Sequence, residues 1–454
     1  MISNLSFDIK NPKKIISDIT KEPLLLSKFY KFIFDSYDKI DTSTFIKNIK
    51  FLSKKINSFT KDKNYDIYIS LSCILGAFLG DSLGSHCEFL NSSPENSKKI
   101  FTNARFQNGQ ITDDSEMAMS KAFAIMDMPD INVLDQNLLF YYYGIWISSK
   151  PLDKGITTSK ALNLFKIDNM AINLNNLFSK EIKASIHEKN KSSKANGALM
   201  RISTFIVWFY YRTKNDIKNE LNSNDKLKFL KIYNEIYNNV SKDVIITHPN
   251  KENIVSCSIF SFMTLCVMNK FNGKETIDKL NILLTNKEFN ANEEKNLKDI
   301  ILNSIKDFNK KDFDKVKYFN KVTEKIGYYV HAFKLSLYYL TDERIIKKTE
   351  DAYLNIIKEI CNYGGDTDTN AAIVGTLIGP LIGYTNFTKN QVYNNFIEFC
   401  SKKRILYTSI LMYFFVDYLD DIFNIKTKKI EDNKEIKFNF LKCFLNMFNV
   451  DLSK

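Results

Sequence analysis

The segment Gln110–Met117 of this chain concentrates short oxygen-bearing side chains at the start of an expected helix. Its sequence is Gln-Ile-Thr-Asp-Asp-Ser-Glu-Met, and the apolar spacing that follows predicts a helix. Thr112 suits an N-cap, and Asp113 would lie in the first turn, where the helix dipole favours carboxylates. A well-capped helix is therefore one interpretation. The alternative is that Thr112, Asp113 and Asp114 turn their oxygens outward as metal ligands.

A second segment, Gly364–Thr369, has more oxygens than a helix start needs. The glycine pair predicts a sharp turn between a helix over 354–363 and another over 370–382. A cap needs one short polar side chain, but Asp366, Asp368 and Thr369 supply three. Carboxylates this close repel one another by about a few kcal/mol unless a cation neutralises them. The pattern favours a metal site over a cap.

The two segments together offer only oxygen ligands. No cysteine or histidine lies beside either one. Such a set suits Mg²⁺ or Mn²⁺ better than Zn²⁺, which takes nitrogen and sulfur. The candidate ligands are Thr112, Asp113, Asp114, Asp366, Asp368 and Thr369.

Two glycine strips indicate which elements bring these segments together. Gly76, Gly80 and Gly84 recur at every fourth residue, as do Gly375, Gly379 and Gly383. Glycine inside a helix costs about 1 kcal/mol per residue, so each strip predicts close packing against another backbone. We expect the strips to pack on each other. Glu88 shares a helix face with Asp81 and is either an acid at the site or a solvated helix end.

Three further segments carry weaker patterns. The turn Lys150–Gly155 contains a spare carboxylate, Asp153. The small-residue stretch 192–201 either holds a phosphate with its free N–H groups or is an ordinary loop before a helix. His248, between Thr247 and Pro249, is either a structural histidine or a ligand contact.

The composition restricts the class of protein. Of 454 residues, 44% are hydrophobic and 26% charged, with a net charge of +12. Only five residues are arginine, which nucleic-acid surfaces favour, so we expect no nucleic-acid partner. The longest apolar run, 405–419, is too short to span a bilayer, so we expect no membrane partner. Seven scattered cysteines without a Cys-x-x-Cys motif favour a reducing, intracellular and most simply cytoplasmic location.

The apolar periodicity predicts an all-α protein. Helices are expected over 255–268 and 326–340, for example, and few hairpin patterns occur. We expect three regions: a lysine-rich helical extension over 1–65, a main domain over 66–425, and a helical tail over 426–454. The extension is either a decoration or recruits an acidic partner. Two polar stretches, about 213–242 and 286–321, are interpreted as insertions in the main domain.

Taken in order, the quoted segments resemble the ADP-ribosylglycohydrolase family. The matching pieces are Gly80–Gly84 with Glu88, then 110–117, 150–155, 196–201, 247–249 and 364–369. The resemblance spans about residues 68–420 and implies a compact orthogonal multi-helix bundle with two Mg²⁺ or Mn²⁺ ions on the six candidate ligands. It implies catalytic roles for Glu88, Asp153 and Asp114, and ADP-ribose binding by Gly155, Asn196, Gly197 and His248.

The resemblance also implies an activity. The expected reaction is hydrolysis of the bond at C1″ of ADP-ribose by water at the binuclear centre, with an N-glycosidic bond to arginine favoured. The alternatives are O-linked substrates (ADP-ribosyl-serine, poly(ADP-ribose) or O-acetyl-ADP-ribose) and a catalytically inactive ADP-ribose-binding or structural relative. The expected partner is an ADP-ribosylated protein or a small molecule containing ADP-ribose, and the expected state is a monomer.

Overall fold

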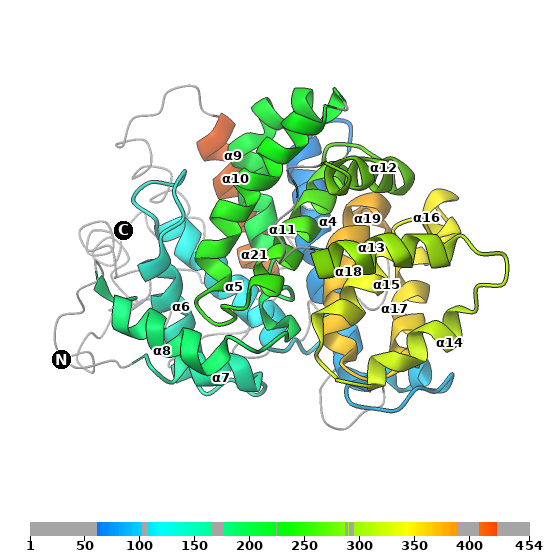
Figure 1. Cartoon of the computed structure of the whole chain (residues 1–454), viewed down its shortest axis with the longest axis horizontal. Coiled ribbons are helices and arrows are strands. Elements are labelled where there is room, and N and C mark those ends of the chain that lie inside the picture. Colours follow the sequence, from blue (N-terminus) through cyan, green and yellow to red (C-terminus); the bar gives the residue numbers. More distant parts are fainter. Residues whose placement is uncertain are drawn as a thin grey trace, which may run out of the picture.

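The structure, a computed structural model, is built from helices joined by loops in the part of the chain that it describes (Figure 1). The described residues are 61–101, 108–165, 176–223, 225–286, 289, 295–387 and 408–424. Within them the only β-type pairing is an isolated antiparallel bridge between Ala195 and Tyr328. The all-α prediction is confirmed. The expected extension over 1–65, apart from residues 61–65, and the expected tail over 426–454 lie outside the described residues.

The helices of the described residues run in chain order from α4 to α21. Their bounds are α4 Tyr65–Gly84, η3 Ser85–Cys87, η4 Asn96–Phe101, α5 Asp113–Asp127, α6 Gln136–Ser148, α7 Ile156–Leu162, α8 Lys180–Asn190, η6 Asn196–Ala198, α9 Ser203–Asn222, α10 Lys226–Val244, α11 Lys251–Met268, α12 Gly273–Leu284, α13 Lys295–Phe308, α14 Lys315–Phe319, η7 Asn320–Thr323, α15 Tyr329–Tyr339, α16 Glu343–Ile346, α17 Ala352–Tyr363, α18 Thr367–Ile382, α19 Tyr384–Phe387 and α21 Thr408–Asn424.

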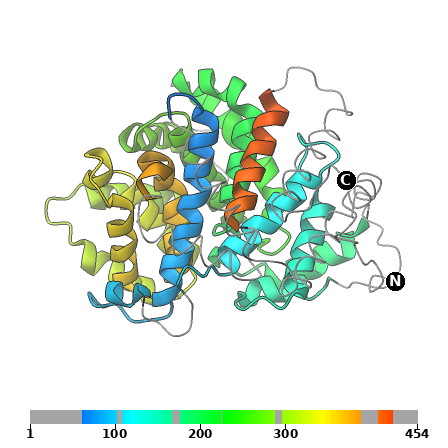
Figure 2. The ribbon, with the colours of Figure 1, turned by 180° about the vertical axis from the view of Figure 1, so that it is seen from behind.

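Helix α4 lies at the centre of the fold and packs antiparallel against α18. The two helices make the most extensive contact in the described part of the chain, and α21 lies along another side of α4 (Figure 2). Eighteen consecutive residues of α4, from Ile67 to Gly84, are buried. Both α4, extended to Cys87, and α11 are long and apolar enough to cross a membrane, yet 100% and 89% of their apolar windows are buried inside the protein. Their apolar character is therefore satisfied by packing.

The glycine strips explain why α4 and α18 come so close. A Cβ added to Gly76 would lie 2.3 Å from the carbonyl oxygen of Gly375, and one on Gly80 would lie 2.3 Å from that of Ala371. A Cβ on Gly84 would meet the Thr367 carbonyl oxygen at 2.3 Å. The expected packing of the two strips is confirmed at Gly375 and Gly379. Gly383 instead ends α18 with a φ of +85°, against the Tyr68 hydroxyl.

Hydrogen bonds from neighbouring elements to α4 hold the pair together. The Thr367 hydroxyl donates to the Gly84 carbonyl oxygen at 2.7 Å, and the Tyr353 hydroxyl donates to that of Gly76 at 2.5 Å. The backbone N–H of Tyr384 donates to the Ser72 hydroxyl at 2.9 Å. Thus α17, α18 and α19 are all joined to α4, and the end of α4 is fixed against the start of α18.

Some helix bounds differ from the prediction. Helix α18 begins at Thr367, three residues earlier than expected, because the turn is completed by Gly364 and Gly365 at φ of +73° and +74°. Helix α15 begins at Tyr329 rather than 326, because Gly327 has a φ of +81°. The polar stretch 213–242 lies mainly in α9 and α10, and the stretch 286–321 contains α13 and α14.

The close packing predicts a strong effect of side chains on the strip. Gly80→Val should lower the free energy of unfolding by about 3 kcal/mol or more, because its branched side chain meets the α18 backbone. Gly155→Val is the control: its Cβ would have its nearest neighbour, Thr158 Oγ1, at 3.8 Å. Urea unfolding measures both variants. Equal stability of the two would contradict the packing.

Candidate metal centre

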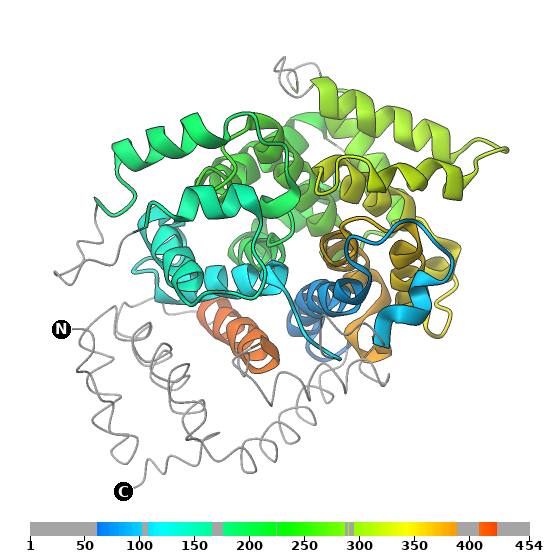
Figure 3. The ribbon, with the colours of Figure 1, turned by 90° about the horizontal axis from the view of Figure 1, so that it is seen from below.

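Seven carboxylates from four parts of the chain converge at one end of the α4–α18 pair. Figure 3 shows the protein from below, toward the C-terminal end of α4, near which Asp81 lies. Three of these residues, from three different elements, offer oxygens that all lie within 4.8 Å of one another: Glu88, Asp153 and Asp368. The full set is Asp81 and Glu88 from α4 and the turn after it, Asp113 and Asp114 from α5, Asp153 from the α6–α7 loop, and Asp366 and Asp368 from α18.

Asp81 fixes the start of α5 from the neighbouring helix. Its fully buried carboxylate accepts the backbone N–H of Thr112 at 3.1 Å and of Ser115 at 3.1 Å. It also accepts the Thr112 hydroxyl at 2.8 Å and the Ser115 hydroxyl at 2.5 Å. Thr112 occupies the N-cap position as expected, but its own side chain makes no capping bond. The cap comes from α4, which leaves lone pairs on the Thr112 oxygen for another ligand.

Asp114 lies at the middle of the acidic cluster. Its Oδ2 accepts the Thr369 hydroxyl at 3.2 Å, which joins α5 to α18. Its Oδ1 is buried and has no hydrogen-bond partner. Burial raises the pKa of Asp114 well above its ordinary value, and the nearby Asp81, Asp113 and Asp366 carboxylates raise it further. A buried carboxylate oxygen without a partner is costly, so this atom requires a proton or a cation.

Asp368 and Asp113 lie in the same electrostatic environment. Burial raises the pKa of Asp368 well above its ordinary value, and Glu88, Asp366 and Asp114 add to this effect. Burial, and then the Asp153 carboxylate, raise the pKa of Asp113. The Gly155 N–H, which donates to Asp113 Oδ2 at 3.2 Å, opposes this shift. Each added negative charge therefore makes its neighbours harder to ionise.

The chemistry of these donors fits a hard divalent cation. No described lysine or arginine forms an ion pair with Asp113, Asp114, Asp366 or Asp368. Two like charges 4 Å apart repel by about 4 kcal/mol in a partly screened site, and a divalent cation removes this cost. Carboxylate and hydroxyl oxygens are the ligands that Mg²⁺ and Mn²⁺ prefer. The buried cluster could thus hold metal.

The loop before α7 brings Asp153 and Gly155 to the cluster. The Asp153 carboxylate lies in the group with Glu88 and Asp368, and the Gly155 N–H holds Asp113. The two candidate catalytic carboxylates, Glu88 and Asp153, therefore face the same small volume from opposite segments.

Asn196 and Gly197 lie next to the cluster on η6. The Asn196 amide donates to Asp366 Oδ2 at 2.7 Å, and its backbone N–H donates to the Gly327 carbonyl oxygen at 2.8 Å. A Cβ on Gly327 would lie 3.5 Å from the Asp366 carboxylate. The loop before α15 is thus part of the site. The sequence analysis overlooked it, although an isolated glycine before a helix could have indicated a close approach.

His248 packs its imidazole ring closely against Gly197. Its imidazole is fully buried, and the Nδ1 atom is 2.8 Å from the Thr247 hydroxyl. A Cβ on Gly197 would meet His248 Cε1 at 2.8 Å and Nε2 at 2.9 Å. His248 therefore packs against Gly197, and a larger residue at Gly197 would displace it.

A buried ion cluster connects the elements that carry the candidate site. Asp243 of α10 accepts Lys121 Nζ of α5 at 2.6 Å and the Tyr143 hydroxyl of α6 at 2.6 Å. The Arg201 guanidinium contacts the Asp243 carboxylate at 3.4 Å and the Gly197 carbonyl oxygen at 3.3 Å. Burial raises the pKa of Asp243, but Lys121 and Arg201 outweigh it, so the net shift is downward. The cluster fixes α5, α6, η6 and α10 against one another.

The comparisons with known proteins identify a family for this chain. The model of the ADP-ribosylglycohydrolase family matches residues 70–394. A protein of Acanthamoeba polyphaga mimivirus, named as an ADP-ribosyl glycohydrolase, is 30% identical over 322 residues, covering 68% of this chain and 86% of the relative. A solved structure described as an ADP-ribosylglycohydrolase-related protein complex is 14% identical with a TM-score of 0.41, covering 75% of this chain and 98% of its own. That likeness is too low to support a conclusion.

The described part of the chain combines an all-α fold with a buried acidic cluster that could hold metal. The family match covers most of the chain, and the chain belongs to the ADP-ribosylglycohydrolase family. The resemblance inferred from the sequence is confirmed at this level. The role of each site residue remains a prediction.

The buried ion cluster predicts an unequal cost of removing two lysines. Lys121→Met should lower the free energy of unfolding by about 3–5 kcal/mol, because it leaves a buried carboxylate without its closest cation. Lys347→Met, which removes an exposed pair with Glu343, should change stability little. Urea denaturation compares them, and equal losses would contradict the role of the cluster.

His248 should remain neutral in acid. Burial and then Arg201 lower its pKa to about 3. The folded pKa lies below the unfolded one, so the contribution of His248 to stability is complete above about pH 6.5 and is lost as the pH falls toward 3. Nitrogen-15 NMR of the imidazole should show the neutral form at pH 5, whereas the urea-unfolded chain should titrate near pH 6.5. A folded-state midpoint near 6.5 would contradict the burial.

Proposed function

We propose that this protein hydrolyses the bond between C1″ of ADP-ribose and a protein side chain. The proposal rests chiefly on one observation, the convergence of the Glu88, Asp153 and Asp368 carboxylates from three elements within 4.8 Å. Membership of the ADP-ribosylglycohydrolase family and the name of the mimivirus relative support the substrate class. The N-glycosidic bond to arginine is favoured, because the 110–117 and 150–155 segments resemble arginine-directed family members.

The proposal assigns two Mg²⁺ or Mn²⁺ ions to the acidic centre. The unpartnered Asp114 Oδ1 and the raised pKa values of Asp113, Asp114 and Asp368 support this assignment. When bound, such cations would polarise substrate oxygens and lower the pKa of a nearby water. The residues that would hold them are Thr112, Asp113, Asp114, Asp366, Asp368 and Thr369.

The remaining carboxylates would move protons and stabilise charge. Glu88 or Asp153 is proposed to donate a proton to the leaving atom and to accept one from the attacking water. The transition state at C1″ resembles an oxocarbenium ion, so fixed negative charge beside it is stabilising. Asp114, which is also a proposed metal ligand, is the third carboxylate that we assign a catalytic role.

Three neutral groups are proposed to orient the ADP-ribose. Asn196 is held by Asp366, and Gly197 is held against His248, so η6 presents a fixed backbone beside the carboxylates. Gly155 presents a second backbone segment beside the carboxylates, through its bond to Asp113. His248 would act by fixing Gly197.

The cellular setting is proposed from the cysteines. The five described cysteines are all buried and free. This supports a reducing compartment, hence an intracellular and most simply cytoplasmic location. We propose a monomer acting on an ADP-ribosylated protein.

Two substitutions test the proposed chemistry. Asp113→Asn and Asp368→Asn should each lower kcat by about a hundredfold or more, because either removes negative charge that holds the cations. Asp312→Asn, on the exposed loop between α13 and α14, is the matched control and should retain full activity. Release of ADP-ribose from ADP-ribosyl-arginine and ADP-ribosyl-serine peptides is measured by chromatography, with and without Mg²⁺ or Mn²⁺.

The same assay separates the alternatives. Release from the arginine peptide alone supports the favoured linkage, and release from the serine peptide alone would move the proposal to O-linked substrates. Binding of ADP-ribose without turnover of either peptide would indicate an inactive reader. Full activity of Asp113→Asn or Asp368→Asn would contradict the metal assignment.

A further inference from the structure

Several exposed apolar residues are sequence neighbours of residues at the acidic centre. Eight large hydrophobic residues are exposed in the described part of the chain, and four of them lie next to residues of the candidate site. Leu152 precedes Asp153, Ile156 follows Gly155, and Ile326 precedes Gly327. The fourth is Phe89, which follows Glu88. Scattered surface apolar residues are ordinary, but half of them at one site indicates a contact surface.

We call Leu152, Ile156 and Ile326 the rim. The site itself fixes their backbone positions. Asp153 lies within the 4.8 Å carboxylate group, and the Gly155 N–H is 3.2 Å from Asp113. Gly327 lies against Asp366, as described above. Each of Leu152, Ile156 and Ile326 is therefore one residue from a group that touches the cluster. The three side chains are 71%, 76% and 46% exposed.

The backbone at the rim is also strained. Six non-glycine residues in the described part have positive φ, and three belong to these segments: Phe89 at 61°, Lys150 at 56° and Lys325 at 52°. Such conformations cost about 1 kcal/mol or more each, and they persist where function requires a particular loop shape. The strain thus coincides with the same three segments that carry the exposed apolar groups.

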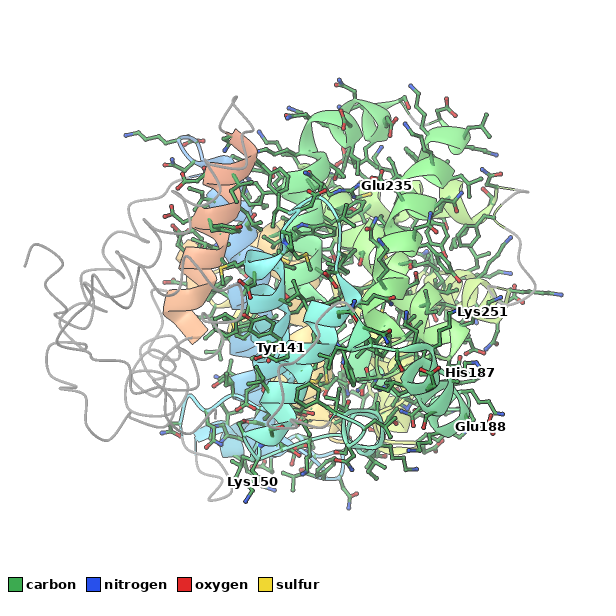
Figure 4. All side chains as sticks on the ribbon, turned by 90° about the vertical axis from the view of Figure 1, so that its left-hand side faces the viewer. Tyr141, Lys150, His187, Glu188, Glu235 and Lys251 are labelled. Atoms are coloured by element: carbon green, nitrogen blue, oxygen red, sulfur yellow. The ribbon has the colours of Figure 1, made fainter. Side chains whose placement is uncertain are left out.

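Lysines alternate with the apolar residues. Lys150 and Lys154 flank Leu152, and Lys325 precedes Ile326; all three lysines are exposed. Lys150 extends from the surface at the lower edge of the view in Figure 4. The described residues form no ion pair with these three ammonium groups. The rim therefore offers apolar contact and positive charge together.

We propose that this rim, formed by Leu152, Ile156 and Ile326 with the adjacent lysines, docks the polypeptide that carries the ADP-ribose. The complementary chemistry is an acidic segment with apolar residues beside the modified side chain. The rim explains how the chain would distinguish a modified protein from a small ADP-ribose compound, which reaches the carboxylates without needing apolar contact outside them. This inference rests on the proposed function.

The test compares two substrates with one reactive bond. One is an ADP-ribosylated amino acid, and the other is a peptide with the same linkage flanked by Leu and Glu; arginine or serine is used according to which the wild type hydrolyses. The variant Leu152→Ser/Ile156→Ser/Ile326→Ser should lower kcat/KM for the peptide about tenfold, as expected for lost interface contacts. It should leave kcat/KM for the amino acid within about twofold.

Matched controls lie elsewhere on the surface. Leu227 and Ile346 are 63% and 67% exposed and lie away from the rim segments in sequence. Leu227→Ser/Ile346→Ser should leave both substrates unaffected. Because all five positions are exposed, the variants should keep the thermal midpoint of the wild type. If the rim variant lost kcat/KM equally on both substrates, or lost none on the peptide, the proposed docking role of the rim would be overturned.

A charge comparison tests the nature of the partner. The wild type should hydrolyse the Glu-flanked peptide faster than a Lys-flanked one, and the preference should shrink at high salt. The variant Lys150→Gln/Lys154→Gln/Lys325→Gln should also reduce the preference for the Glu-flanked peptide. Equal or faster hydrolysis of the Lys-flanked peptide by the wild type would overturn the acidic partner.

The two levels of the proposal fail differently. If the wild type hydrolyses neither the amino acid nor the peptide, the proposed function is contradicted, and the docking rim with it. If it hydrolyses both and the rim variants match the controls, only the docking surface is contradicted.

Discussion

The close contact between the backbones of α4 and α18 determines where the acidic residues lie. Without a side chain at Gly76, Gly80 and Gly84, the two helices approach until carbonyl oxygens of α18 lie 2.3 Å from where each Cβ would be. The end of α4 then lies against the start of α18, and Glu88 comes next to Asp368. A wider separation would increase the distance between these carboxylates. The packing that stabilises the centre of the fold is therefore also what concentrates negative charge.

That charge makes the site dependent on a neutralising partner. Burial and mutual repulsion raise the pKa values of Asp113, Asp114 and Asp368, and Asp114 Oδ1 has no hydrogen bond. Asp81 is different: burial raises its pKa to about 6, against donors from Thr112 and Ser115 that favour its ionised form. Asp81 thus serves the helix start, while its neighbours have oxygens available for cations. The buried Lys121–Asp243–Arg201 cluster holds the surrounding helices without neutralising this centre directly.

Much of this organisation could be predicted from the sequence because it is local. Helix starts at acidic segments, the Gly364–Gly365 turn and the spacing of the glycine strips depend on neighbouring residues, and the structure confirms them. The family could be inferred from the same segments. The overlooked features join distant residues: Asp81 caps a helix 31 residues away, and Lys121 binds the carbonyl oxygen of Arg201, 80 residues away. The pattern around Gly327 was also missed, because its importance comes from the approach of Asn196 and Asp366.

The central claim is that the carboxylates around Asp114 hold divalent cations. Anomalous scattering from crystals of the protein grown with Mn²⁺ tests it most directly, because it locates the metal without reference to activity. The account predicts two anomalous peaks, with oxygens of Asp114, Asp366 and Asp368 among the ligands at about 2.1 Å. Crystals in millimolar Mn²⁺ with no peak at these carboxylates would contradict it and would show that protons alone neutralise the centre.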